Sequence, residues 1–193
     1  MKLTEQPYRT FPEEGVDTAV KQMPLLIKDA RYPLSAAGLM EQRLQASSSQ
    51  DKEVKQSWLY NHFFLGDGAD RRKDGRLKIF LDSLELRRIN PQTKLVDGAL
   101  PQSEEAYLKQ PGIELNPEEV EKYTEKFLTR QEAKDNKIWR ILARHPDVVP
   151  EVPEDLVRDR NLLSEYVDLV FSEGFDNAMR VYVAAPESAL RLW

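Results

Sequence analysis

The first part of the chain combines short apolar runs with frequent proline. Four prolines fall within residues 1–34 and exclude a long helix there, while the apolar run 23–27 suits a short strand or a clamp across the core. Ser35 is a suitable N-cap for a helix over 36–46, because apolar residues then recur at a spacing of four. The pattern therefore predicts one regular helix after an irregular start.

A second helix and a strand are predicted next. Asp51 can cap a helix over 51–64, and glycines end it. Asp74-Gly75 favours a turn, and Leu77, Ile79 and Leu81 then alternate with Lys78, Phe80 and Asp82, which predicts a strand over 76–82. The same apolar residues also fit the helical period, so a helix is an alternative there. A short extended piece is expected around 94–96.

The carboxyl-terminal half has the clearest helical patterns. Asn116-Pro117 and Thr129, each with a glutamate three residues after the cap, predict helices over 117–128 and 130–144. The amphipathic pattern continues in a long helix over 154–173. Alternation then predicts a strand over 179–183, and Pro186 can open a last short helix that ends at Trp193.

These patterns predict a helix-rich α+β fold, with a mainly helical carboxyl-terminal half and a small sheet or hairpins. At 193 residues the chain suits a single domain over 1–193, with a subdomain break near 100–116 as a variant. The apolar end 190–193 should dock on this domain or on a partner, unless the natural protein continues beyond it.

Composition narrows the function classes. The chain has 33 acidic and 28 basic residues, a net charge of -5, which disfavours non-specific attraction to nucleic acid or to an anionic membrane. It has no cysteine, so disulfides, thiolate metal sites and cysteine nucleophiles are excluded. No secretory signal and no apolar run of about 18 residues is present, so we expect a cytoplasmic protein without membrane spans.

Segment 58–76 is the strongest candidate for a binding surface. Aromatic rings on the end of a helix precede a loop in which both charge signs alternate, and such rings are favoured at interface cores. An interaction or assembly component without catalytic activity is thus the first hypothesis, with a protein partner or self-association. The weak candidates for ligand or partner contact are Trp58, His62, Phe64, Asp67, Arg71, Arg72 and, at the tail, Trp193.

An enzyme is the second hypothesis, namely a metal-assisted hydrolase that uses carboxylates and His62. The spacing of His62 and the carboxylates matches no known ligand motif, and the loop that follows fails as a calcium loop because Arg72 and Leu81 occupy ligand positions. Glycine-rich phosphate loops are also missing. We therefore assign no metal, no cofactor and no catalytic residue.

Single-stranded nucleic-acid binding is the third hypothesis. Basic side chains of 71–76 beside aromatic rings could neutralise phosphates and stack on bases. Asp67, Asp70 and Asp74 interleave with these basic residues and cancel much of the local positive field, so nucleic acid is not the expected partner.

Overall fold

The computed structural model describes residues 18–31, 33–61, 63, 65–95, 99–149, 161–175, 179–181 and 189–192. The helices in these residues are α1 (Thr18–Lys28), α2 (Ala36–Ser47), α3 (Lys52–Leu59), α4 (Leu84–Arg87), α5 (Glu104–Lys109), α6 (Pro117–Tyr123), α7 (Arg130–Asp135), α8 (Lys137–Leu142) and α9 (Leu162–Ser172). The strands are β1 (Gly68–Arg71), β2 (Leu77–Phe80), β3 (Leu100–Pro101), β4 (Ile113–Leu115) and β5 (Ala189–Leu192). The predicted helix-rich α+β fold is confirmed.

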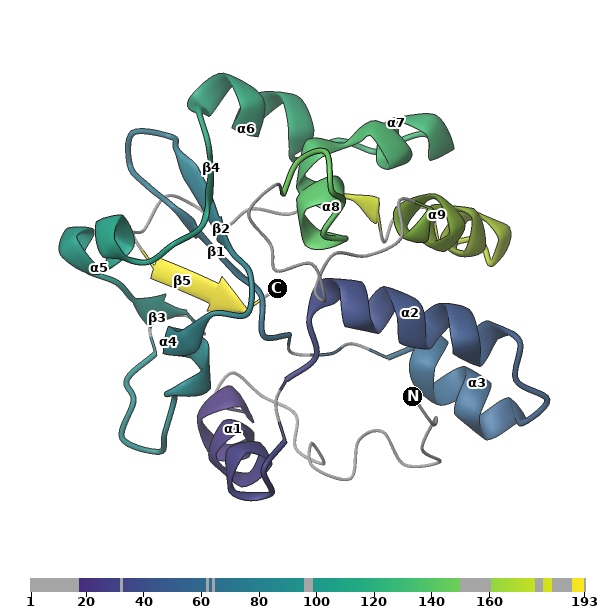
Figure 1. Ribbon diagram of the computed structural model, residues 1–193, viewed down its shortest axis with the longest axis horizontal. Coiled ribbons are helices and arrows are strands. Elements are labelled where there is room, and N and C mark those ends of the chain that lie inside the picture. The colour runs from purple at the N-terminus through teal and green to yellow at the C-terminus, as the bar shows by residue number, and fades with distance from the viewer. Residues whose placement is uncertain are drawn as a thin grey trace.

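The five strands form one antiparallel sheet in the order β3-β5-β1-β2-β4. β1 and β2 are a hairpin whose turn contains Gly75 at φ 90°, a backbone conformation that favours glycine, as the Asp-Gly signal predicted. β5, although last in the chain, lies between β1 and β3 (Figure 1). The apolar end of the chain therefore docks on this domain.

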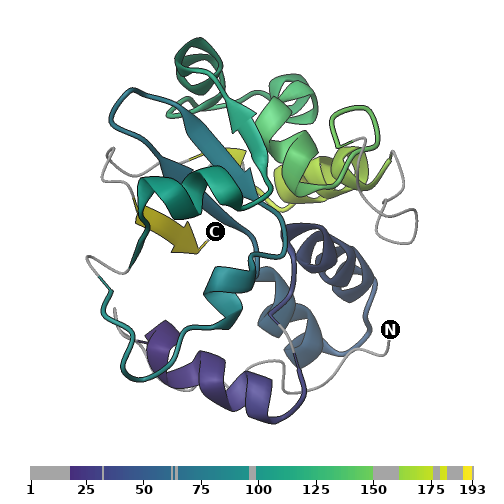
Figure 2. The ribbon, with the colours of Figure 1, turned by 60° about the vertical axis from the view of Figure 1, so that its left-hand side comes forward.

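Helices cover both faces of the sheet (Figures 1 and 2). On one face, side chains such as Leu77 and Ile79 of β2 pack against Ile138 and Leu142 of α8 and against α2, α3 and α6. On the other face, Phe80 packs with residues of α1, α4 and α5. A further apolar cluster joins α2, α7 and α9. The sheet thus separates two layers of helices.

Several helices begin where local sequence predicted. Ser35 accepts a hydrogen bond from Gly38 N at 3.0 Å and caps α2, and Asp51 caps α3. Capping boxes start α6 and α7 at Asn116 and Thr129. α3 and α6 are shorter than predicted. The expected helix over 130–144 is divided into α7 and α8 by Asn136, which ends the first and caps the second.

Other predictions at this level were wrong. Residues 23–27 belong to helix α1, although Pro24 lies inside it. Residues 179–181 form no strand, and the segment that was expected to be a final helix contains strand β5 instead. Strand pairing with β1 and β3 decides the conformation there, because backbone hydrogen bonds across a sheet do not depend on local periodicity. The first part of the predicted 154–173 helix lies outside the described residues, which show α9 from Leu162.

Candidate functional site

The aromatic half of the predicted binding segment is only partly at the surface. Trp58 of α3 is 6% exposed, and its ring stacks on Phe63 with a centroid distance of 5.3 Å and an interplanar angle of 15°. Arg43 of α2 donates from Nε to the carbonyl of Trp58 at 3.1 Å. The Trp58 ring is therefore used in internal packing. His62, Phe64 and Trp193 lie outside the described residues.

Asp67 lies at the centre of a buried ion network. Its carboxylate accepts two hydrogen bonds from Arg144, at 3.0 and 3.3 Å, and one from the backbone N–H of Ala36 at 2.7 Å. The backbone N–H of Asp82 donates to it at 2.9 Å, and the Asp82 carboxylate accepts from Arg144 at 2.9 Å. Both oxygens of Asp67 are thereby satisfied. This network joins the start of α2, the entry to β1, the end of β2 and the end of α8, which is a structural role.

A second group of charges lies on the face of the sheet that α5 covers, and we call it the polar sheet face. Asp70 of β1 is opposite Lys78 of β2, and Lys78 is opposite Glu114 of β4, so three charged residues share one row across three strands. Arg72 and Tyr107 complete the group. The Arg72 guanidinium lies 3.9 Å from the centre of the Tyr107 ring and forms a cation–π contact.

Burial changes the protonation equilibria of this group. It raises the pKa of the Asp70 carboxyl, an effect that Arg72 opposes and Glu104 strengthens. It lowers the pKa of the Lys78 amine, whose Nζ donates to the carbonyl of Tyr107 at 2.8 Å. It also raises the pKa of Tyr107, whose hydroxyl donates to Glu114 at 2.7 Å. Perturbed groups of this kind cluster at functional sites, and also in structural ion networks.

The basic residues of segment 71–76 are mostly occupied. Arg72 is 4% exposed and forms ion pairs with Asp70 at 3.0 Å and with Glu104 at 3.2 Å. Arg76 forms an ion pair with Asp74 at 2.7 Å. Arg71 is half-buried, and among the described basic residues of the segment only Lys73 is exposed. The segment therefore presents little free positive charge.

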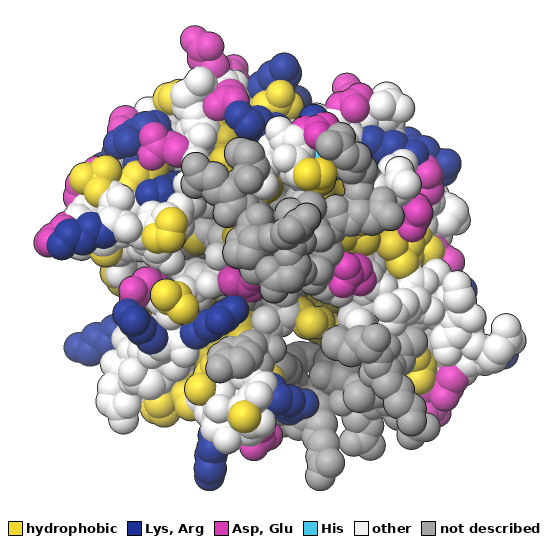
Figure 3. Space-filling model, in the orientation of Figure 1, with side chains coloured by type: hydrophobic (Ala, Val, Ile, Leu, Met, Phe, Trp, Pro, Cys, Tyr) yellow, Lys and Arg dark blue, Asp and Glu magenta, His cyan; other side chains and the backbone are white. Residues whose placement is uncertain are grey.

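Basic side chains also gather around α1 and α4 on the face shown in Figure 3, whereas both signs alternate over its upper part. Three arginines in or beside these helices each form an ion pair with a neighbouring carboxylate. These pairs are Arg31–Asp29 at 3.8 Å, Arg87–Asp82 at 3.4 Å and Arg88–Glu85 at 3.2 Å.

An exposed aromatic pair lies where the ends of α3 and α9 meet. Tyr60 is 52% and Phe175 is 37% exposed, and their rings are edge-to-face with centroids 5.3 Å apart. Glu173 accepts a hydrogen bond from the Tyr60 hydroxyl at 3.3 Å and forms an ion pair with Lys55 at 3.7 Å. We call Lys55, Tyr60, Glu173 and Phe175 the α3–α9 patch.

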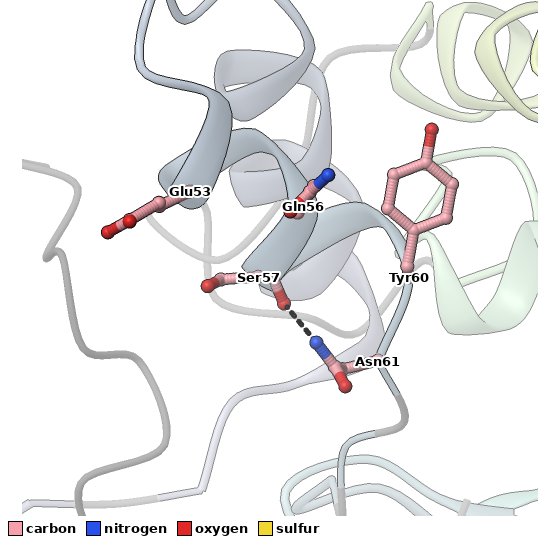
Figure 4. A pocket seen from close by; sticks show the side chains of 5 residues that line it. All are labelled: Glu53, Gln56, Ser57, Tyr60 and Asn61. Atoms are coloured by element: carbon pink, nitrogen blue, oxygen red, sulfur yellow. Dashed lines mark hydrogen bonds between the residues drawn. The ribbon is translucent and has the colours of Figure 1, made fainter.

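An open depression adjoins this patch at Tyr60. Its lining comes from α3 and the residues just after it, and consists of Glu53, Gln56, Ser57, Tyr60 and Asn61 (Figure 4). Asn61 is held by a hydrogen bond from Nδ2 to the carbonyl of Ser57 at 3.2 Å. In Figure 4 the Tyr60 ring stands on the opposite side of the helix end from the Glu53 side chain. The depression offers carboxylate, amide and hydroxyl groups beside an aromatic ring.

Among the described residues, no group of three or more His, Asp or Glu side chains is placed to hold a metal ion. None of the described helices combines the length and the apolar character that crossing a membrane requires. The chain matches no protein-family model, no curated protein and no solved structure.

Sequence reasoning missed two of these features. The α3–α9 patch joins residues more than 100 positions apart, and no local pattern connects them. The polar sheet face had a signal, because Lys78 and Phe80 share one face of the predicted strand. Lys78 by itself favours an exposed face, so only the large apolar Phe80 beside it indicated that this face is covered.

Proposed function

We propose that the protein is a non-catalytic interaction component that binds another protein chain, and that the α3–α9 patch is its contact surface. The observation that carries the proposal is the exposed, edge-to-face pair of Tyr60 and Phe175. Aromatic side chains of this kind provide most of the binding energy in many protein interfaces. We also propose a cytoplasmic location, with which a chain without cysteine is compatible.

The surroundings of the pair support this role. The Tyr60 hydroxyl donates to Glu173 at 3.3 Å and the ring contacts Phe175, so these contacts restrict the side chain before a partner covers it. Lys55 and Glu173 provide a charged border, which matches the usual arrangement of an apolar centre and a polar rim. The neighbouring depression gives a partner side chain a recess beside Tyr60.

The partner is another copy of this chain or a different protein. The double variant Tyr60→Ala/Phe175→Ala tests both kinds of partner. Leu108→Ala is the matched control, because Leu108 is 63% exposed on α5 and lies outside the patch. Sedimentation velocity measures self-association of each purified protein, and affinity capture compares the proteins that co-purify with each variant. We expect the double variant to weaken association at least tenfold and the control to match the wild type.

A wild-type protein that is a monodisperse monomer, together with a captured set unchanged by the double variant, would contradict the proposal. Circular dichroism of the double variant provides the folding control. Because neither side chain belongs to one of the apolar clusters of the core, their removal should leave the helical signal intact.

The other two hypotheses stay predictions. The hydrolase depends on His62, which lies outside the described residues. Nucleic-acid binding depends on basic residues of segment 71–76, of which Arg72 and Arg76 are engaged in ion pairs. A titration of the protein into a labelled single-stranded oligonucleotide at low salt tests that binding directly.

A further inference from the structure

Helix α5 is attached to the rest of the molecule through very few buried side chains. Of its six residues only Tyr107 is buried; Ala106 is half-buried and the other four are exposed. Two of the exposed residues, Glu105 and Lys109, form an ion pair within the helix. Hydrogen bonds from Tyr107 to Glu114 and from Gln110 to Ser83 complete the attachment. A segment with this little buried apolar surface opens locally at a lower cost than the core does.

The single buried side chain of α5 rests on charged groups. The Tyr107 ring contacts the Arg72 guanidinium, and the Nζ of Lys78 lies 4.9 Å from the ring centre. Lys78 also donates to the Tyr107 carbonyl. Phe80 is the apolar partner, with ring centroids 6.3 Å apart. Closure of α5 therefore places an aromatic ring over an ammonium and a guanidinium.

On the same face, beside Arg72, Asp70 is fully buried and poorly solvated. It has 0% exposure, and neither of its carboxylate oxygens accepts a hydrogen bond within the described residues. Its compensation is the ion pair with Arg72 at 3.0 Å. Asp67, three residues earlier, has both oxygens hydrogen-bonded. A buried carboxylate without hydrogen-bond donors carries a large desolvation cost when it is ionised.

The charged groups around Asp70 come from three elements. Arg72 follows β1, Lys78 is the register partner on β2, and Glu104 of α5 contacts Arg72 at 3.2 Å. Tyr107 of α5 also lies in this group. On the fourth side β5 places Leu190, an uncharged residue, opposite Asp70. Arg72 favours the ionised carboxyl, whereas burial and Glu104 oppose it.

We propose that α5 is a lid over the polar sheet face and that ionisation of Asp70 favours the open lid. In the open position water can hydrate the carboxylate and the negative charge of Glu104 can move away. In the closed position Asp70 is better accommodated as the neutral acid, which can donate one hydrogen bond. This device is independent of the α3–α9 patch.

The direction of the pH effect follows from the raised pKa of Asp70 in the closed state. The closed lid binds the proton of Asp70 more tightly than the open lid, in which water hydrates the carboxylate. Raising the pH through the interval between the pKa of the open state and that of the closed state therefore shifts the lid toward opening. Between low pH and a pH above both pKa values, the equilibrium constant for lid opening rises by roughly tenfold for each unit that separates the pKa of the open state from that of the closed state. Above both pKa values it no longer changes with pH.

Hydrogen exchange of the backbone amides tests this mechanism. The exchange rates are measured between pH 4 and pH 8 and are corrected for intrinsic exchange. The amides of residues 107–110 report the opening of α5, and the amides of α9 report global unfolding. The variant Asp70→Asn removes the charge at nearly constant size, and Asp74→Asn is the matched control in the same hairpin, where Asp74 is exposed.

In the wild type and in D74N we expect the opening of α5 to increase with pH more steeply than the opening of α9. In D70N this additional pH dependence should disappear, and α5 should be protected at pH 7 to the level that the wild type reaches only in acid. The same pH dependence of α5 in D70N and wild type would overturn the proposal. So would α5 amides that exchange only through global unfolding. If D70N loses the protection of α9, Asp70→Ser provides the same comparison.

Discussion

At the scale of single residues, two buried aspartates differ in how their carboxylates are stabilised. Asp67 immediately precedes β1, and Asp70 lies in that strand. Asp67 is surrounded by donors from Arg144, Ala36 and Asp82. Asp70 has an ion pair but accepts no hydrogen bond from the residues that the structure describes. A buried carboxylate whose oxygens are all hydrogen-bonded makes the structure around it rigid. A buried carboxylate without hydrogen bonds destabilises the folded state, and a conformational change that hydrates it removes this cost.

The first prediction concerns the satisfied carboxylate. Asp67→Ala should leave the Arg144 guanidinium, which is 2% exposed, with only the half-exposed Asp82 as its carboxylate partner. Removal of one partner from a buried ion pair destabilises proteins by about 3–5 kcal/mol. Urea denaturation followed by circular dichroism measures this loss. Asp135→Ala, at an exposed position on α7, should change the free energy of unfolding by less than about 1 kcal/mol.

At the scale of elements, the starts of helices were readable because a cap is a local interaction. Ser35, Asp51, Asn116 and Thr129 each bond to backbone N–H groups two or three residues ahead, so the signal lies within four residues of sequence. Helix ends were less predictable. Asn136 interrupts an apolar pattern that continues without a break, and only its cap geometry reveals two helices.

The second prediction tests one of these caps. Thr129→Ala removes both the hydroxyl that accepts from Glu132 N at 3.3 Å and its own bond to the Glu132 carboxylate. We expect a loss of about 1 kcal/mol in the free energy of unfolding. Thr129→Ser keeps the hydroxyl and should retain most of that stability. An equal loss in both variants, measured by urea denaturation, would show that the methyl group of Thr129 matters rather than the cap.

At the scale of the whole molecule, the end of the chain completes the centre of the sheet. β5 contacts β1 on one side and β3 on the other, so it joins segments near residues 70 and 100 that are not otherwise paired. β3 and β4, which lie within the expected subdomain break at 100–116, belong to this same sheet. Residues 189–192 are therefore an integral part of the sheet.

The third prediction follows from this position. Leu190→Pro places a residue without an N–H in a strand that is paired on both sides, and proline is not tolerated there. The free energy of unfolding should fall by about 3 kcal/mol or more. Leu190→Val retains the backbone N–H and a strand-forming side chain, so it should lose much less. Thermal unfolding compares the two, and equal midpoints would show that the pairing of β5 contributes little.

The aromatic residues of segment 58–76 show that local sequence can predict a binding segment without predicting which of its side chains are exposed. Its composition indicated a surface, yet Trp58 is packed inside and Tyr60, two residues later, is exposed. A helix end turns adjacent side chains in different directions: Trp58 packs into the core cluster with residues of α2 and β2, whereas Tyr60 contacts Phe175 after the end of α9. The partner of Tyr60 in the patch, Phe175, had no sequence signal that linked it to this segment.

The sequence by itself determined the class of fold, the helix caps, the hairpin at Asp74-Gly75 and the absence of thiol chemistry, because these depend on residue type and on neighbours a few positions away. The tertiary structure alone decided the pairing of β5, the row of Asp70, Lys78 and Glu114, and the exposure of the Tyr60–Phe175 pair. Each of these depends on contacts between distant segments. The free energy of such contacts comes from burial and from sheet hydrogen bonds, which local periodicity does not encode.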